Sequence, residues 1–293
     1  MIQFVLLLSF SFFSHALPWS STPHPEYKNP VFYDGWMESS VLSKKTHYLV
    51  LVPPGLNPNK IKQVIFYFPG GNGKAINMAA ELDPFVSDFV ETLSHTVILA
   101  PDSLGSLNMR SNTPGQPVED LTLETMNYIL KELQVKRKPF LVGHSMGGAA
   151  AIHFAFMHGN KFRAISSISP ALFNFSPFEI TDSQLANWIE LHSRKQDFQF
   201  FKNYIEGIKL SFVAPEYWES FDLYTRLSKE QLPYCFKVYV GAKDTFGFDY
   251  LVKEYINYAA SIGKRVKYYM DPNREHAIGT AMSYAILDML KCH

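Results

Sequence analysis

Little in this 293-residue sequence favours charge-driven recognition or metal chemistry. Lysine plus arginine and aspartate plus glutamate balance at 27 each, so no basic excess points to nucleic acid or an anionic surface. The sequence also lacks H-E-x-x-H, C-x-x-C and Walker-type motifs, which would hold a metal ion or a phosphate group. We therefore expect no cofactor, no metal ion and no nucleic-acid partner.

Long apolar runs are absent beyond the N-terminus, which predicts no integral membrane association. Residues 2–13 are almost wholly apolar, and small residues follow at Ser14 and Ala16. This pattern predicts a signal peptide over residues 1–16, cleaved after Ala16, and hence a secreted or periplasmic protein. A membrane anchor is the alternative, but the run is shorter than the roughly 20 residues that a span requires.

Residues 17–293 are expected to form a single α/β domain, because 47% of the chain is hydrophobic and only 18% is charged. Short apolar runs that are rich in β-branched and aromatic residues alternate with helical patterns. Strands are expected at 46–52, 64–68, 96–100, 140–142, 163–168, 236–240 and 266–270. Helices are expected at 120–133, 146–158, 248–262 and 276–290. This alternation predicts a doubly wound, mostly parallel sheet that helices cover on both faces.

One segment interrupts the alternation of strands and helices. Residues 171–233 separate the strands that end near Ile168 and start near Phe236, and roughly 60 residues exceed an ordinary connection. The segment is rich in phenylalanine, tyrosine and tryptophan. We interpret it as a helical, aromatic-rich insertion above the sheet; plain helical packing without a role in binding is the alternative.

Only two cysteines are present, Cys235 and Cys292. Cys235 lies at the entrance of the penultimate strand, and the final helix would return Cys292 to the same edge of the sheet. An exported chain can oxidise such a pair, so we expect a disulfide between them, with two buried free thiols as the alternative.

The strongest motif is the run from Gly143 to Gly148, which reads G-H-S-M-G-G and matches G-x-S-x-G. It follows a short apolar strand and opens a helix of small residues, which is the context that a nucleophile elbow requires. The serine hydroxyl would project above the sheet, and the helix N-terminus behind it would favour developing negative charge. The motif predicts that Ser145 is a nucleophile.

A serine needs a base and an orienting acid, and in this arrangement both follow the serine along the chain. His276 lies in the loop after the last expected strand and is the predicted base. Asp244 follows the penultimate strand and is the predicted acid. Asp249 is the alternative acid, although it resembles the N-cap of the next helix.

Two backbone N–H groups should stabilise the oxyanion of the tetrahedral intermediate. One is expected from Met146, directly after the serine. The other is expected from Gly71 in the glycine-rich loop 69–73, with Asn72 as the near alternative, since glycine lets the backbone approach closely.

These residues together resemble the putative esterase family of α/β hydrolases, which includes S-formylglutathione hydrolases and feruloyl esterases. The likeness is carried by Lys45 to Pro53, Phe66 to Gly71, the elbow, and Gly241 to Asp244 with His276. The resemblance implies the α/β-hydrolase fold, ester hydrolysis through an acyl-enzyme, and no cofactor. Two departures are Pro69, where the family often has histidine, and Ala277 with Ile278, where it often has aromatic residues.

The sequence thus predicts a secreted serine esterase, a carboxylic ester hydrolase that acts on a small-molecule, lipid or aromatic ester. An acyltransferase and a serine peptidase use the same triad and remain alternatives. A non-catalytic exported binding protein is disfavoured, because serine, histidine and aspartate are all retained.

Overall fold

The computed structural model describes residues 17–29, 31–195 and 197–292. The predicted signal peptide, residues 1–16, lies outside the described residues. In the described part of the chain, no helix is long and apolar enough to cross a membrane.

A central sheet organises the fold, with its strands in the order β1-β2-β4-β3-β7-β8-β9-β10. The strands are β1 (Phe32–Ser39), β2 (Lys44–Leu51), β3 (Gln63–Phe68), β4 (Thr96–Pro101), β7 (Phe140–His144), β8 (Ala164–Ile168), β9 (Phe236–Gly241) and β10 (Tyr268–Asp271). β2 runs antiparallel to both β1 and β4, and all other pairings are parallel. A small hairpin, β5 (Asn112–Thr113) with β6 (Gln116–Pro117), stands apart. The predicted mostly parallel sheet is confirmed.

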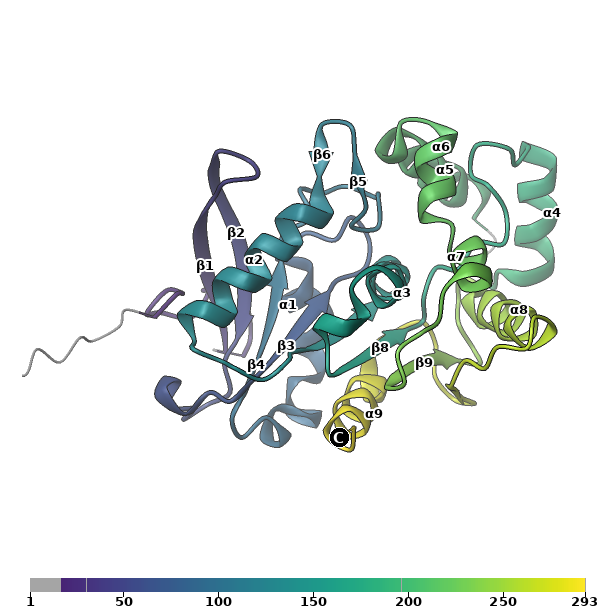
Figure 1. The fold of residues 1–293 in the computed structure, drawn as a ribbon. Coiled ribbons are helices and arrows are strands. Elements are labelled where there is room, and N and C mark those ends of the chain that lie inside the picture. The colour runs from purple at the N-terminus through teal and green to yellow at the C-terminus, as the bar shows by residue number, and fades with distance from the viewer. Residues whose placement is uncertain (1–16, 30, 196, 293) are drawn as a thin grey trace, which may run out of the picture.

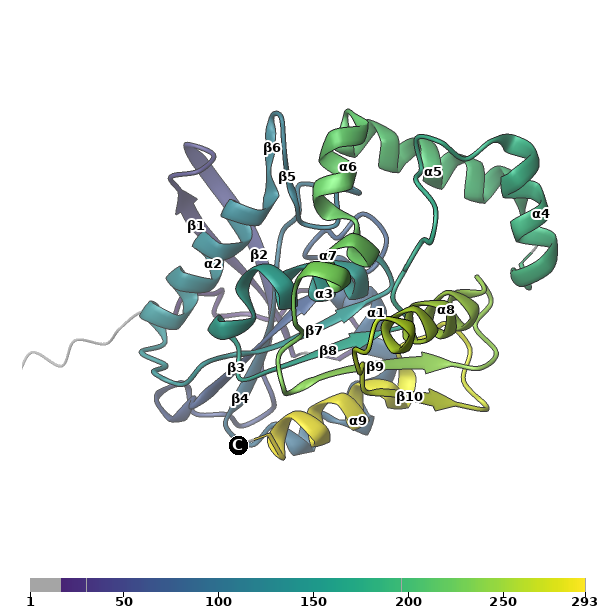
Figure 2. The same cartoon turned by 45° about the vertical axis from the view of Figure 1, so that its right-hand side comes forward.

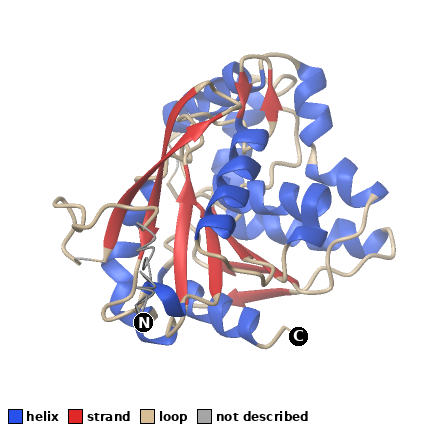
Figure 3. Ribbon diagram, turned by 60° about the vertical axis from the view of Figure 1, so that its left-hand side comes forward, coloured by secondary structure: helices blue, strands red, loops and turns tan. Residues whose placement is uncertain are grey.

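Helices cover both faces of this sheet (Figure 3). α2 (Val118–Glu132), α3 (Met146–His158) and α8 (Phe248–Ser261) contribute to the apolar core on one face, and α1 (Asn77–Leu82) and α9 (Gly279–Leu290) to the core on the other. Successive side chains of a strand point to opposite faces, so β3 sends Phe66 and Phe68 to the first core and Ile65 and Tyr67 to the second. Burial on both faces explains why the parallel strands read as continuous apolar runs.

The structure differs from the sequence-based expectation at β1 and at the start of α9. β1 was not predicted, because it is half-buried and Gly35 interrupts its apolar pattern. A side chain at Gly35 would overlap the ring of Tyr48 on β2, so the pairing itself demands glycine there. The last helix begins at Gly279, not at His276, which leaves His276 in the preceding loop.

The segment between β8 and β9 holds four helices, counted over the described residues. They are α4 (Asp182–His192), α5 (Phe198–Phe212), α6 (Pro215–Phe221) and α7 (Leu223–Lys229). Thr181 starts α4 with a capping box, and Asp197 caps α5 by accepting the Phe200 N–H. α4, α5 and α6 group together on one side of the sheet, away from α9 (Figures 1 and 2).

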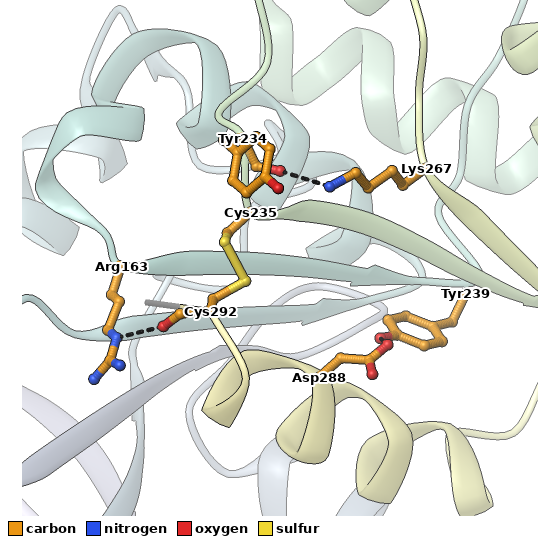
Figure 4. The surroundings of a disulfide bond; sticks show 7 residues. All are labelled: Arg163, Tyr234, Cys235, Tyr239, Lys267, Asp288 and Cys292. Atoms are coloured by element: carbon orange, nitrogen blue, oxygen red, sulfur yellow. Dashed lines mark hydrogen bonds between the residues drawn. A yellow bond between two sulfur atoms is a disulfide. The ribbon is translucent and has the colours of Figure 1, made fainter.

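A disulfide joins Cys235 to Cys292, with 6.1 Å between the two Cα atoms, so the expected pairing is confirmed. It links Cys235, directly before β9, to Cys292, two residues beyond the C-terminal end of α9 (Figure 4). The Arg163 Nε–H also donates to the Cys292 carbonyl at 2.8 Å. The bridge fastens the end of the chain to the amino-terminal edge of the parallel strands.

Candidate active site

The predicted site residues follow the carboxyl ends of strands that lie in one sheet. The glycine-rich loop follows β3, Ser145 follows β7, Asp244 follows β9 and His276 follows β10. Parallel strands place their carboxyl ends at the same edge, so residues distant in sequence meet there.

Ser145 occupies a sharp turn between β7 and α3, at φ 55° and ψ −118°. This backbone conformation is rarely adopted by residues with a side chain and costs about 1–3 kcal/mol. The flanking glycines are required by close contacts, because a Cβ at Gly147 would lie 1.9 Å from the Phe68 carbonyl oxygen and a Cβ at Gly143 would lie 2.0 Å from the Gly147 oxygen. The Ser145 N–H donates to the Ile168 carbonyl at 2.9 Å, which ties the turn to β8.

The structure brings Ser145, His276 and Asp244 together in one hydrogen-bonded row. His276 Nε2 lies 3.0 Å from Ser145 Oγ, and His276 Nδ1 lies 2.8 Å from Asp244 Oδ2. A carboxylate can only accept, so Nδ1 carries the proton and Nε2 is free to accept the serine hydroxyl proton. The row has the geometry that a general base and its nucleophile need.

Asp244 is fully buried and oriented by its own loop. Its Oδ1 accepts the N–H groups of Phe246 at 2.9 Å and Phe248 at 3.4 Å, which leaves Oδ2 for His276. The alternative acid, Asp249, instead pairs with Arg194 at 3.0 Å. Gly247 occupies the N-cap position of α8, so the interpretation of Asp249 as an N-cap was wrong; it lies in the first turn.

The environment of His276 favours its neutral form. Burial lowers the pKa of the imidazole from its ordinary value, and the hydrogen bond and charge of Asp244 oppose that shift. The rings of Phe246 and Phe248 approach the imidazole with centroids 4.7 and 5.2 Å away. A neutral imidazole is the state that can remove a proton from serine.

The two predicted oxyanion donors lie beside the serine. Met146 is the first residue of α3, and Gly71 turns the loop after β3 at φ 59°. Considering the described residues alone, neither N–H has a hydrogen-bond acceptor, so both are available to a ligand. The neighbouring Gly70 N–H differs, because it donates to Glu81 Oε1 at 2.8 Å. In the same loop, the Asn72 side-chain oxygen accepts from Asn77 at 2.9 Å.

A pocket of about 250 Å³ opens over Ser145 and His276. Aromatic side chains from α5, from the loop after Asp244 and from the start of α8 form much of its wall: Phe200, Phe201, Tyr204, Phe246 and Phe248. The cation of Lys195 lies 3.8 Å from the centre of the Phe200 ring. The aromatic-rich segment after β8 therefore contributes directly to the cavity beside the serine.

Sequence reasoning missed two residues that line this pocket, Glu81 and His144. Glu81 lies on the short helix α1, and no motif surrounds it. His144 occupies an unspecified position of G-x-S-x-G, which carries no signal for a role. In the described part of the chain, no group of three or more His, Cys, Asp or Glu side chains is placed to hold a metal ion.

Comparison with known proteins agrees with the motifs. Residues 110–212 match the model of the family described as putative esterase. A search of curated proteins gives no match to this chain. The resemblance to the putative esterase family is confirmed over these residues, and the match supports a carboxylic ester hydrolase.

Solved structures share the fold at low sequence identity. The fluorophosphonate-binding serine hydrolase FphF of Staphylococcus aureus has a TM-score of 0.61 at 18% identity, covering 88% of this chain and 98% of its own. An S-formylglutathione hydrolase from Agrobacterium tumefaciens has a TM-score of 0.62 at 17% identity, covering 89% and 95%. A ferulic acid esterase has a TM-score of 0.59 at 17% identity, covering 89% and 98%. The predicted α/β-hydrolase fold is confirmed.

Proposed function

We propose that this protein is a secreted serine esterase in which Ser145, His276 and Asp244 act as a catalytic triad. The observation that carries the proposal is the hydrogen-bonded row from Ser145 Oγ through the imidazole to the buried carboxylate of Asp244. The match to the putative esterase family supports the choice of an ester as substrate.

In the first half-reaction, Ser145 Oγ forms a bond to the ester carbonyl carbon while its proton moves to His276 Nε2. The carbonyl electron pair becomes an oxyanion, which the N–H groups of Met146 and Gly71 stabilise. Collapse of this intermediate breaks the carbon–oxygen bond to the alcohol, which leaves with the proton from His276. Asp244 holds the imidazole and stabilises its charged form.

In the second half-reaction, water attacks the acyl-enzyme and gives its proton to His276. The acid is released, and Ser145 recovers its hydrogen from the imidazolium. An acyltransferase would replace that water with an alcohol acceptor, and a peptidase would cleave an amide in the first step.

The pocket supports a proposal for the substrate class. Its volume of about 250 Å³ and its aromatic wall suit a short acyl chain or a single aromatic ring.

Secretion is part of the proposal, and two features support it. The apolar N-terminal run with Ala16 predicts cleavage by signal peptidase, and the disulfide suits an oxidising compartment. Sequencing the N-terminus of protein recovered from the medium or periplasm should give Leu17 as the first residue. A protein that stays inside the cell and begins at Met1 would contradict this part.

The catalytic proposal is tested with Ser145→Ala. Purified wild type should hydrolyse p-nitrophenyl acetate and react with a fluorophosphonate probe, whereas the variant should do neither and keep its circular dichroism spectrum. We expect a fall in kcat of about 10⁶-fold, as in other triads that lose the serine. Full turnover by the variant would exclude the mechanism.

A panel of acetyl, butyryl, octanoyl and feruloyl esters and a peptide amide, each with and without an alcohol acceptor, then separates hydrolase, acyltransferase and peptidase.

A further inference from the structure

Glu81 contacts three different parts of the active-site framework. Its Oε1 accepts the Gly70 N–H at 2.8 Å, its Oε2 accepts the Tyr67 hydroxyl, and Oε2 also lies 3.2 Å from His144 Nδ1. The carboxylate therefore joins the end of β3, the oxyanion loop and the residue before the nucleophile.

His144 connects the Glu81 contacts to the loop that carries His276, the proposed base. Its Nε2 lies 2.9 Å from the carbonyl oxygen of His276. A carbonyl only accepts, so Nε2 carries a proton, and Nδ1 faces the Glu81 carboxylate oxygen. Burial acts to lower the pKa of His144, but Glu81 and the His276 carbonyl together raise it above its ordinary value. His144 and Glu81 thus form a close imidazole–carboxylate contact in which the imidazole is buried and the carboxylate is part-buried.

This pair lies beside the triad but is separate from it. The rings of His144 and His276 have centroids 5.0 Å apart, and the triad imidazole already has Ser145 and Asp244 as partners. No proton transfer in the proposed reaction uses Glu81 or His144. Removing Glu81, however, frees the Gly70 N–H, and removing His144 frees the His276 carbonyl.

We propose that Glu81 and His144 are positioning residues that lock the oxyanion loop and the His276 loop to the nucleophile elbow. Glu81 fixes the Gly70 N–H, so that the next N–H, that of Gly71, faces the serine. His144 fixes the His276 carbonyl, so that the imidazole stays aligned with Ser145 Oγ. The inference rests on the proposed esterase function, because it assigns these residues a role in the same reaction.

The test compares Glu81→Ala with Glu81→Gln. The glutamine variant retains an oxygen for the Gly70 N–H and an amide that can donate to a neutral His144, whereas alanine removes both contacts. With p-nitrophenyl acetate, we expect kcat to fall about 100-fold in the alanine variant, which is the scale of a lost oxyanion donor, and to stay within about fivefold of wild type in the glutamine variant. KM should change less than about threefold in both, because the aromatic wall of the pocket is untouched.

A second readout separates positioning from general destabilisation. Benzeneboronic acid forms a tetrahedral adduct with an activated serine and mimics the transition state, so its inhibition constant should rise with the loss in kcat, while that of the product acetate stays constant. His144→Phe keeps a ring but removes the donor to His276, and we expect about a tenfold lower kcat. This variant decides the question if Glu81→Ala fails to fold.

Glu119→Gln is the matched control, because Glu119 is also a part-buried carboxylate bound to imidazoles. It lies 3.1 Å from His153 Nε2 and 2.7 Å from His158 Nε2, and none of these three residues lines the pocket. We expect this control to lower thermal stability and to leave kcat within about twofold of wild type.

The proposal is overturned if folded Glu81→Ala keeps kcat within about threefold of wild type, or if folded His144→Phe is fully active. It is also overturned if Glu119→Gln lowers kcat as much as Glu81→Ala does. Active Ser145→Ala would instead refute the esterase mechanism itself, so the two failures are distinguishable.

Discussion

Removing the Cys235–Cys292 disulfide should lower the stability of this protein and leave its catalytic rate unchanged. The bridge lies at the amino end of β9, whereas Asp244 follows the carboxyl end of the same strand. The double variant Cys235→Ser with Cys292→Ser avoids a lone reactive thiol. We expect a less stable enzyme with an unchanged active site.

The size of the effect follows from the length of chain that the bridge closes. The two cysteines are 57 residues apart in sequence. The loop-closure expression for a disulfide gives about 4 kcal/mol for such a loop, at the upper end of the usual 2–4 kcal/mol range. In a protein of this size, 1 kcal/mol shifts the melting temperature by about 2–4 °C, so we expect a decrease on the order of 10 °C. The Arg163 contact to Cys292 uses a backbone carbonyl and survives the substitution.

The measurement is urea unfolding followed by tryptophan fluorescence, with the initial rate of p-nitrophenyl acetate hydrolysis recorded at 25 °C. We expect the free energy of unfolding to fall by about 3–4 kcal/mol and kcat to stay within about 1.5-fold of wild type. A loss below about 1 kcal/mol would refute the reasoning about stability. A tenfold fall in kcat with intact folding would refute the claim that the disulfide at one end of the sheet does not affect the active site at the other. As a control, unreduced wild type should show no free thiol after denaturation.

Two further predictions concern the triad. Burial lowers the pKa of His276 from 6.5, and only the neutral imidazole accepts the serine proton. The value of kcat/KM should therefore be constant at neutral pH and fall on acidification, with a midpoint below pH 6.5. A pH profile with its acid midpoint above 7 would contradict this prediction. Asp244→Asn should lower kcat by about 10⁴-fold, because an asparagine favours the wrong imidazole tautomer. Asp249→Asn, which weakens the pairs with Arg194 and Lys253, should stay within about threefold of wild type in the same kinetic assay. Equal losses in both variants would contradict the assignment of Asp244 as the acid.

Local sequence patterns determined much of the fold, and the reason is physical. Buried parallel strands are continuous apolar runs, and the helices between them carry apolar residues at helical spacing. Both can therefore be predicted from the local sequence. The elbow motif was equally clear. Its glycines are required, since a Cβ added at Gly143 or Gly147 would lie about 2 Å from a neighbouring backbone oxygen. The sequence pattern did not predict β1, because Gly35 is required by the Tyr48 ring on β2 and a local pattern contains no information about a neighbouring strand.

The elbow motif and the chain order predicted Ser145, His276 and either Asp244 or Asp249 as partners, because the carboxyl ends of parallel strands must meet. Both aspartates follow the same strand, so only the tertiary structure shows that Asp244 contacts the imidazole and that Asp249 instead contacts Arg194. The Glu81–His144 pair belongs wholly to the tertiary structure. A carboxylate on α1 and an imidazole at the end of β7 are far apart along the chain, and neither becomes a partner until the sheet places the two segments side by side.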